Sequence, residues 1–204
     1  MKNNLIITIG RQYGSGGREI GMMLSKLFGI AYYDKKLITE AAKRSGLADE
    51  TFEKYEERRF GSLWHALSTG FNVSGGFAPE DIFRIQSETI MDIAAKEPCV
   101  IVGRCADYVL RDRPDCFNVF VSAPAGVRTR RVAVRRNISH EEAAAAIVKT
   151  DKSRASYYDF YTEKTWGAAA SYQLCTDSSL LGLEGTARLI ENFIKDALVQ
   201  RAEE

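Results

Sequence analysis

The chain has no long hydrophobic run. No stretch of about 18 consecutive apolar residues occurs, which is the length that a membrane-spanning helix needs. The first ten residues, MKNNLIITIG, also lack the long apolar core and small-residue cleavage site of a secretory signal. We therefore expect a cytoplasmic protein without a membrane partner.

Cysteine and histidine are scarce. The four cysteines, Cys99, Cys105, Cys116 and Cys175, are widely spaced and form no C-x-x-C pair. This spacing favours reduced, mostly buried thiols over a disulfide framework or a zinc site. The two histidines, His65 and His140, match no serine or cysteine dyad pattern. We expect neither a metal held directly by protein side chains nor histidine-based catalysis.

An excess of one charge is absent as well, because 28 lysines and arginines face 27 acidic residues. A protein that binds nucleic acid through its overall field carries a larger positive excess. We therefore expect no nucleic-acid partner, and any anion site must be local. The length of 204 residues suits one α/β domain, and composition leaves the oligomeric state open.

Apolar runs of strand type alternate with helical patterns along the chain. Strands are expected at Leu5–Ile9, Ile30–Tyr33, Cys99–Val102, Val119–Val121 and Tyr172–Cys175. Helices are expected at about 16–28, 35–45, 49–58, 79–96, 124–136, 139–163 and 183–201. Such alternation predicts right-handed βαβ units and a parallel sheet covered on both faces. Ser139 with Glu142 has the pattern of a capping box.

The most informative motif is a glycine-rich stretch after the first strand. Gly10, Gly14, Gly16, Gly17 and Gly21 lie between Leu5–Ile9 and the first helical pattern. Glycines permit positive φ and close backbone approach, so amides at the start of the helix can face an anion. The expected phosphate donors are Ser15 and the amides of Gly14, Gly16, Gly17 and Arg18. The alternative is a glycine-rich turn with a purely structural role.

One element of a phosphate-binding loop is missing. The usual pattern, G-x-x-x-x-G-K-[ST], places a lysine on the β- and γ-phosphates. Gly17 stands where that lysine belongs, and Arg18 and Glu19 follow it. Removing one donor from developing charge typically costs roughly 3–4 kcal/mol of transition-state stabilisation. We hypothesise that Arg18, one residue further on, restores the positive charge.

Three other groups of residues are candidates for anion binding. They are Arg104 with Asp107 after the third strand, the helical stripe Arg128, Arg131 and Arg135, and the helical pair Asp151 and Arg154. The first group lies where open α/β sheets bind ligands, at the carboxyl ends of the strands. For every group, an ordinary solvated surface residue or a simple ion pair is the alternative.

Together these segments resemble the cytidylate kinase group of nucleoside monophosphate kinases, and more closely its divergent cytidylate kinase-like branch. Residues 7–21, ITIGRQYGSGGREIG, are similar almost letter for letter to the opening of that branch, and Tyr32-Tyr33-Asp34-Lys35 is similar to its F/Y-Y-D-K. The resemblance implies one domain with a three-layer P-loop kinase fold and a mostly five-stranded parallel sheet. It implies a core at 1–45 and 98–204, an acceptor-binding insertion at about 46–97 and a helical lid at about 137–155.

The residue patterns and the resemblance together give single residues expected roles. Donor nucleotide binding falls to Gly14, Ser15, Gly16, Gly17, Arg18, Glu19 and Arg131. Acceptor binding falls to Asp34, Arg104, Asp151 and Arg154, with Asp107 on the same rim. Catalysis falls to Arg18, Arg104, Asp151 and Arg154. The chain departs from the better-known cytidylate kinases at Gly17, at Ile147 and at Cys105, which replaces an aspartate.

The resemblance implies a kinase that uses ATP and Mg²⁺ to phosphorylate a nucleoside monophosphate, CMP or dCMP. Two alternatives stay open: a nucleotide- or phosphate-binding regulatory protein with weak or no kinase activity, and a kinase that acts on another small-molecule acceptor. The segment 60–78 is either a flap over the site or an irregular surface loop.

Overall fold

The computed structural model describes residues 4–44, 46–48 and 79–203. Within these ranges five strands form one sheet: β1 (Ile6–Arg11), β2 (Ala31–Tyr33), β3 (Cys99–Val102), β4 (Cys116–Ser122) and β5 (Leu174–Asp177). The strand order is β2-β3-β1-β4-β5, and every neighbouring pair is parallel. The first strand of the chain therefore lies at the centre of the sheet.

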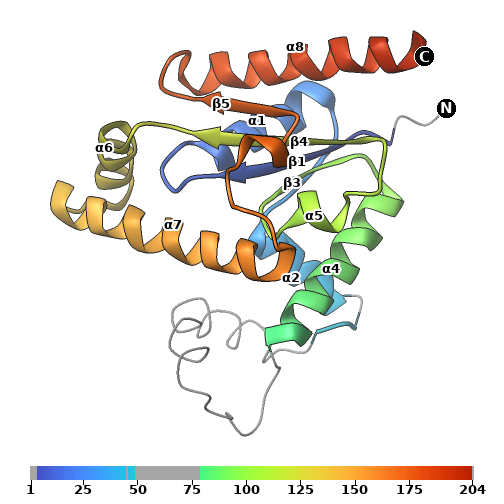
Figure 1. Cartoon of the computed structure of the whole chain (residues 1–204), viewed down its shortest axis with the longest axis horizontal. Helices are drawn as coiled ribbons and strands as arrows, with labels where there is room; N and C mark the ends of the chain where they lie inside the picture. Colours follow the sequence, from blue (N-terminus) through green and yellow to red (C-terminus); the bar gives the residue numbers. More distant parts are fainter. Residues whose placement is uncertain (1–3, 45, 49–78, 204) are drawn as a thin grey trace, which may run out of the picture.

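Helices cover both faces of this sheet (Figure 1). They are α1 (Gly17–Phe28), α2 (Lys35–Arg44), α4 (Pro79–Lys96), α5 (Ala106–Val109), α6 (Ala125–Arg136), α7 (His140–Thr162) and α8 (Gly182–Glu203), with a short 3₁₀ turn at Ala169–Ser171. α1 and α8 lie on one side, whereas α2, α4, α5 and α7 lie on the other. The predicted α/β class, with a parallel sheet between two helical layers, is confirmed.

The alternation of side chains along β1 explains why both faces are covered. Ile7 and Ile9 enter the core formed with α1 and α8, where Leu24 and Ile190 also lie. Ile6 enters a second core, on the opposite face, with residues of α2 and α4 such as Ile90. A strand buried on both faces must be apolar at nearly every position, as parallel strands are.

The strand register brings the carboxyl ends of β1, β3 and β4 to one edge of the sheet. Ile9 pairs with Val102 of β3 and with Val119 of β4. The segments that follow these strands therefore begin side by side, where ligands of open α/β sheets bind.

Two strands begin more than one residue away from the predicted start. β4 begins at Cys116 rather than at Val119, because the polar residue Asn118 lies inside the strand, where its Oδ1 accepts a hydrogen bond from Thr8 Oγ1 at 2.6 Å. β5 begins at Leu174 rather than at Tyr172, because the amide of Tyr172 donates to the carbonyl of Ala169 and closes the 3₁₀ turn.

Two short elements, the helix α5 and the 3₁₀ turn, were not predicted, because three or four residues are too few for a helical period to show. The expected helix at 49–58 and the segment 60–78 fall outside the described residues. The division into a core, an insertion and a lid stays a prediction.

All four cysteines carry free thiols. Cys99, Cys105 and Cys116 are buried, and Cys175 is exposed. Burial raises the pKa of the Cys99 thiol to about 12. In the described ranges, no helix is long and apolar enough to cross a bilayer.

The start of α7 confirms the predicted capping box. The amide of Glu142 donates to Ser139 Oγ at 3.1 Å, and the amide of Ser139 donates to Glu142 Oε2 at 2.9 Å. Two amides that would lack a partner inside the helix are thereby satisfied.

Replacing Ser139 by alanine removes the side-chain acceptor of this cap. We expect Ser139→Ala to lower the free energy of unfolding by about 1 kcal/mol, measured by urea denaturation. Ser139→Asp is the matched control, because an aspartate at this position also accepts from the third helical amide and should retain most of the stability. Equal loss in both variants would contradict a role for the cap.

Candidate functional site

The loop after β1 turns sharply at two glycines. Gly14 and Gly16 have φ of 81° and 85°, in the left-handed region. A Cβ added at Gly14 would lie 2.9 Å from the carbonyl oxygen of Arg128, so a larger residue would collide with α6. The buried Ser15 donates its hydroxyl to the carbonyl of Gln12 at 2.9 Å. The hydroxyl of Ser15 therefore holds the turn closed.

The turn leads directly into α1. Gly16 is the N-cap residue and provides no side-chain cap, and the amide of Ile20 donates to its carbonyl at 2.9 Å. The amides of Gly17, Arg18 and Glu19 precede this first helical hydrogen bond and so have no partner within the helix. Such a helix start favours an anion, both through these amides and through the helix dipole.

An ion pair between α6 and α7 holds the loop in place. Asp151 accepts a hydrogen bond from the amide of Tyr13 at 2.7 Å and from Arg128 Nη1 at 2.6 Å. Arg128 also donates to the carbonyl of Tyr13 at 3.1 Å. Only 11% of the Arg128 side chain and 17% of the Asp151 side chain are exposed. Asp151, expected to contact an acceptor, here positions the loop backbone.

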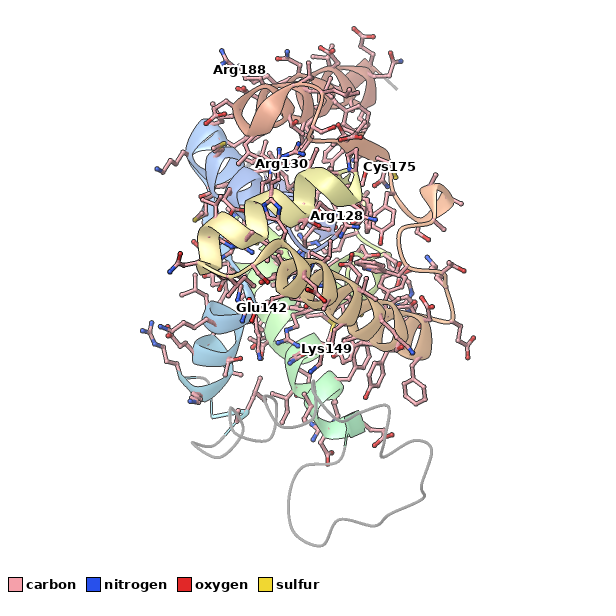
Figure 2. All side chains as sticks on the ribbon, turned by 90° about the vertical axis from the view of Figure 1, so that its left-hand side faces the viewer. Arg128, Arg130, Glu142, Lys149, Cys175 and Arg188 are labelled. Carbon is pink, nitrogen blue, oxygen red and sulfur yellow. The ribbon has the colours of Figure 1, made fainter. Side chains whose placement is uncertain are left out.

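The other arginines of the predicted stripe also face the loop. Arg131 donates to the carbonyl of Ser15 at 3.1 Å and to Ser178 Oγ at 2.8 Å, which ties the loop to the segment after β5. Arg135 forms an ion pair with Glu19 at 3.2 Å. The predicted spacing of the stripe thus brings three guanidinium groups to one face of α6 (Figure 2 labels the first, Arg128).

Arg18 does not reach over the loop. Its Nε and Nη2 atoms lie 2.9 and 2.8 Å from Asp34 Oδ2, and 63% of its side chain is exposed. The other oxygen of Asp34 accepts from the amides of Lys36 and Leu37 at 3.1 and 3.3 Å and caps α2. Arg18 and Asp34, which were expected to bind donor and acceptor respectively, bind each other at the end of β2.

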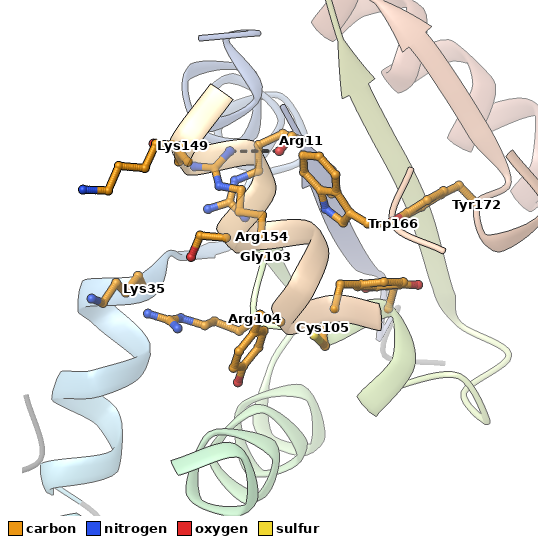
Figure 3. A pocket seen from close by; sticks show the side chains of 15 residues that line it. Arg11, Lys35, Gly103, Arg104, Cys105, Lys149, Arg154, Trp166 and Tyr172 are labelled. Carbon is orange, nitrogen blue, oxygen red and sulfur yellow. Dashed lines mark hydrogen bonds between the residues drawn. The ribbon is translucent and has the colours of Figure 1, made fainter. Parts of the chain in front are cut away.

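A pocket of about 330 Å³ opens between the end of β1, the start of α5 and the side of α7 (Figure 3). Its lining is cationic and aromatic. The cations are Arg11, Lys35, Arg104, Lys149 and Arg154, and the aromatic residues are Tyr157, Tyr158, Trp166 and Tyr172. Figure 3 shows the guanidinium of Arg104 directed toward Lys35, across the mouth of the pocket from Lys149.

Three of these cations crowd together. Arg154 Nη1 donates to the carbonyl oxygen of Arg11 at 2.9 Å (dashed in Figure 3). Burial, together with repulsion from Arg154 and Arg104, lowers the pKa of Arg11 well below its usual range. Burial also lowers the pKa of Arg154. An anion that entered this pocket would reduce the repulsion among these guanidinium groups and compensate for the water that they lose on burial.

The backbone beside the pocket is strained. Gly103, Arg104 and Cys105 have φ of 83°, 60° and 53°, so three successive residues are left-handed. For residues other than glycine this conformation costs on the order of 1–2 kcal/mol each. Such strain is typical of binding sites. Here it points the side chain of Arg104 into the pocket.

A carboxyl group also lines the pocket. Asp107, at the start of α5, accepts a hydrogen bond from the hydroxyl of Tyr158 at 2.7 Å. Burial raises the pKa of Asp107. Burial and the neighbouring Asp107 likewise raise the pKa of Tyr158. The structure thus places Asp107 in the same pocket as Arg104 and Arg154, while the roles of all three stay predictions.

A second hollow, of about 430 Å³, borders the same loop. It is lined by Gly14, Gly16, Glu19, Arg130, Arg131, Val134, Arg135 and Leu183. Since Gly10 and Arg11 line the first pocket and Gly14 and Gly16 line the second, the loop borders both. The site therefore has two hollows, which share this loop as a border.

Sequence reasoning assigned no role to several residues of the first pocket. They are Arg11, Lys35, Lys149, Tyr157, Tyr158, Trp166 and Tyr172. The aromatic residues and Lys149 come from α7 and the segment after it, where a mixed aromatic and polar pattern gives no sign of which face lines a cavity. Arg11 and Lys35 lie inside quoted motifs, where their side-chain directions could not be known.

Comparison with known proteins gives a consistent result. A family model described as the cytidylate kinase-like family matches residues 6–180. The chain is similar to the cytidylate kinase of Pyrococcus abyssi, with 28% identity over 199 residues that cover 95% of each chain. It is also similar to the cytidylate kinase of Methanocaldococcus jannaschii, with 26% identity over 194 residues that cover 93% of this chain and 97% of that one.

Solved structures share the fold. An uncharacterised protein from Eubacterium ventriosum matches with a TM-score of 0.73 and 28% identity, over 94% of this chain and 98% of that chain. Shikimate kinase from Bacteroides thetaiotaomicron matches with a TM-score of 0.53 and 13% identity, over 94% and 98% of the two chains, which is a likeness of fold alone.

The Arg128–Asp151 pair generates a stability prediction. Asp151→Ala leaves a buried guanidinium without its carboxylate and the Tyr13 amide without its acceptor, so we expect a loss of about 3 kcal/mol in the free energy of unfolding. The matched control is Glu88→Ala, which breaks the more exposed Arg84–Glu88 pair on α4 and should cost less than about 1 kcal/mol. Similar losses of unfolding free energy in the two variants, measured by urea denaturation, would contradict the role of Asp151 in holding the loop.

Asp107 generates a prediction of pH dependence. Because its folded-state pKa is raised, the buried carboxylate costs stability at pH 7, and protonation stabilises the folded state at low pH. Asp107→Asn should therefore raise the melting temperature at pH 7, and this gain should vanish as the pH falls through the folded-state pKa of Asp107.

The matched control for Asp107 is Asp115→Asn. A hydrogen bond from Arg113 lowers the pKa of Asp115, so its carboxylate adds stability that is lost as the pH falls through its folded-state pKa. This second variant should lower the melting temperature at pH 7. If both variants changed the melting temperature at pH 7 in the same direction, the opposite pKa shifts assigned to Asp107 and Asp115 would be contradicted.

Proposed function

The chain belongs to the cytidylate kinase-like family and has a P-loop kinase fold, and from this premise we propose that it transfers the γ-phosphoryl group of ATP to a nucleoside monophosphate. The proposed acceptor is CMP or dCMP, because the curated relatives of similar length are cytidylate kinases.

The observation that carries this proposal is the cationic pocket at the end of β1. Phosphoryl transfer needs little covalent chemistry from the protein, and its rate depends on positioning and on cations that balance charge on the phosphoryl oxygens. Arg104 and Arg154, with Lys35 and Lys149 nearer the mouth, offer such cations to the phosphate of an acceptor. The pairing of Asp34 with Arg18 leaves Asp34 to position α2.

The donor nucleotide would occupy the second hollow. Its phosphates would meet the amides of Gly16, Gly17 and Arg18 at the start of α1, as anions do at helix N-termini. Arg131 and Arg135 line the same hollow from α6. Because Arg131 is bonded to the carbonyl of Ser15, it also keeps the loop backbone in position.

Magnesium fits the carboxylate present on the donor side. This ion keeps several water ligands and binds mainly phosphate oxygens and one or two carboxylates, so it needs few protein ligands. Glu19, in the first turn of α1, presents a partly exposed carboxylate to the second hollow. When bound with ATP, Mg²⁺ would balance charge on the phosphates.

The acceptor side offers further recognition groups. The Asp107 carboxyl would accept a hydrogen bond from a sugar hydroxyl, and the flat side chains of Trp166 and Tyr172 form an apolar wall. Lys149 and Arg154 come from α7, whose first half lies in the predicted lid at 137–155. Closure of that segment would exclude water from the transferring group.

The proposal predicts that ATP, Mg²⁺ and CMP yield ADP and CDP, measured by chromatography of the nucleotides. Arg104→Gln should lower kcat/KM at least about 100-fold, because it removes a donor to developing charge. Arg188→Gln is the matched control, because Arg188 lies exposed on α8 at the far end of the molecule (Figure 2), and should stay within about twofold.

A thermal-shift panel of nucleoside mono- and triphosphates separates the alternatives. A ligand at about 100 times its Kd adds about 2.7 kcal/mol of stability. Binding without transfer to any monophosphate would favour a regulatory protein. Transfer to a non-nucleotide acceptor would favour a kinase of changed specificity, and no shift with any nucleotide would overturn the proposal.

A further inference from the structure

We propose that Arg11 supplies the cation that the phosphate-binding loop lacks at Gly17. In this assignment the Arg11 guanidinium binds the phosphoryl group that passes between donor and acceptor. The assignment rests on the proposed function, and it replaces the hypothesis that Arg18 restores the missing charge.

The first argument is an exchange of residue types within the loop. In the pattern G-x-x-x-x-G-K, the first glycine lies six residues before the lysine. Here Gly17 stands at the lysine position, and Arg11 stands six residues earlier, at the position of the first glycine. The loop has therefore not simply lost a cation: a glycine and a basic residue have exchanged places.

The second argument is steric. A Cβ added at Gly17 would lie 2.6 Å from Arg11 Cβ, a distance that nonbonded carbon atoms essentially never show, and 3.0 Å from Arg11 Cγ, which is also unusually tight. Side chains at positions 11 and 17 therefore exclude one another. The stem of Arg11 fills the space through which a lysine at position 17 would leave the backbone, so a basic residue at one position requires glycine at the other.

The third argument is the place that the guanidinium of Arg11 reaches. It lies against Gly103, where its Nη1 atom fills the space that a side chain would need. From there it faces the pocket that Arg104 and Arg154 also line. Arg11 is thus directed from the phosphate-binding loop toward the expected acceptor side, between the two ligands.

The fourth argument concerns the charges around Arg11. Repulsion from Arg154 and Arg104 lowers the pKa of Arg11, and Asp34, the carboxylate that acts against this effect, is already bound by Arg18 at 2.8 Å. Within the described ranges, no carboxylate lies within ion-pair distance of the Arg11 guanidinium. A desolvated cation among like charges is stabilised by an anion, and the phosphoryl group would supply one.

Arg18 cannot take this role without breaking two contacts. Its guanidinium is bound to Asp34, and Asp34 in turn caps α2. Its exposed position is also less suited to electrostatic stabilisation, because water screens exposed charges more strongly than buried ones. Arg11 already has the burial and the direction that Arg18 lacks.

The proposed step needs no chemical change in Arg11. The bond between the γ-phosphorus of ATP and the oxygen that bridges it to the β-phosphate breaks, and a phosphate oxygen of the acceptor forms the new bond to that phosphorus. The electron pair of the broken bond leaves with ADP. Arg11 stays protonated and donates two parallel hydrogen bonds to the oxygens of the moving group, as guanidinium forks do with phosphate.

The test is an exchange of the two residues back to the usual pattern. Arg11→Gln should lower kcat at least about 100-fold, by loss of one donor to developing charge. Gly17→Lys alone should also lose activity, because Arg11 blocks the new stem. The double variant R11G/G17K frees that space, and we expect it to recover at least tenfold over R11G.

The double variant R11Q/G17K is the matched control, since glutamine keeps most of the stem of Arg11 and should block recovery. The fold-decrease in kcat caused by Arg18→Gln should be at least ten times smaller than the fold-decrease caused by Arg11→Gln. Thermal unfolding of each variant checks that it folds. Recovery in R11Q/G17K equal to that in R11G/G17K would overturn the steric exclusion, and wild-type kcat in Arg11→Gln would overturn the assignment.

Calorimetry with ATP and Mg²⁺ separates this assignment from the proposed function. If the wild-type protein binds ATP but transfers phosphate to no acceptor, the kinase proposal fails. The contact between Arg11 and the ATP phosphates is then still tested by the binding affinities. Affinity at least tenfold weaker in Arg11→Gln, but not in Arg188→Gln, supports a phosphate contact. Equal affinity in the wild type and in Arg11→Gln overturns it.

Discussion

Mutual repulsion among three guanidinium groups, of which Arg104 is buried and Arg11 and Arg154 are partly buried, is the constraint on which the arrangement of the site depends. Arg11, Arg104 and Arg154 come from the end of β1, the end of β3 and the middle of α7. The parallel sheet brings two of them together, since its strands end at one edge, and α7 adds the third. The cost of this crowding falls on the unliganded protein, and an anion converts it into binding energy.

The rest of the structure keeps these charges where they are. Two apolar cores, one on each face of the sheet, hold β1 rigidly between α1 with α8 and α2 with α4. Asp151 and Arg128 then fix the backbone of the loop that follows β1. Donors that are held in position before a substrate arrives need no reorganisation during the reaction, which is how electrostatic catalysis becomes effective.

Periodicity sufficed to predict most of the fold. The helices and strands follow from apolar spacing, and the cap at Ser139 follows from a local pattern. The start of β4 could not be predicted, because Asn118 is polar in sequence and is satisfied by Thr8 from a strand that lies more than a hundred residues away. For the site, the strand-end rule placed Arg104 and Asp107 in one pocket, but helical spacing did not reveal that Asp151 faces the loop while Arg154 contacts Arg11.

The amino-acid sequence by itself determined the glycine loop, the parallel sheet and the absence of a lysine at Gly17, because these depend on residue type and on spacing along one strand or helix. Only the tertiary structure decided which arginine faces the pocket beside that loop. Arg18 is nearer in sequence to Gly17, where the lysine is missing, yet Asp34 binds it, and the stem of Arg11 lies against Gly17. Competition for space and for a counter-charge depends on the folded backbone, which brings together groups that sequence order keeps apart.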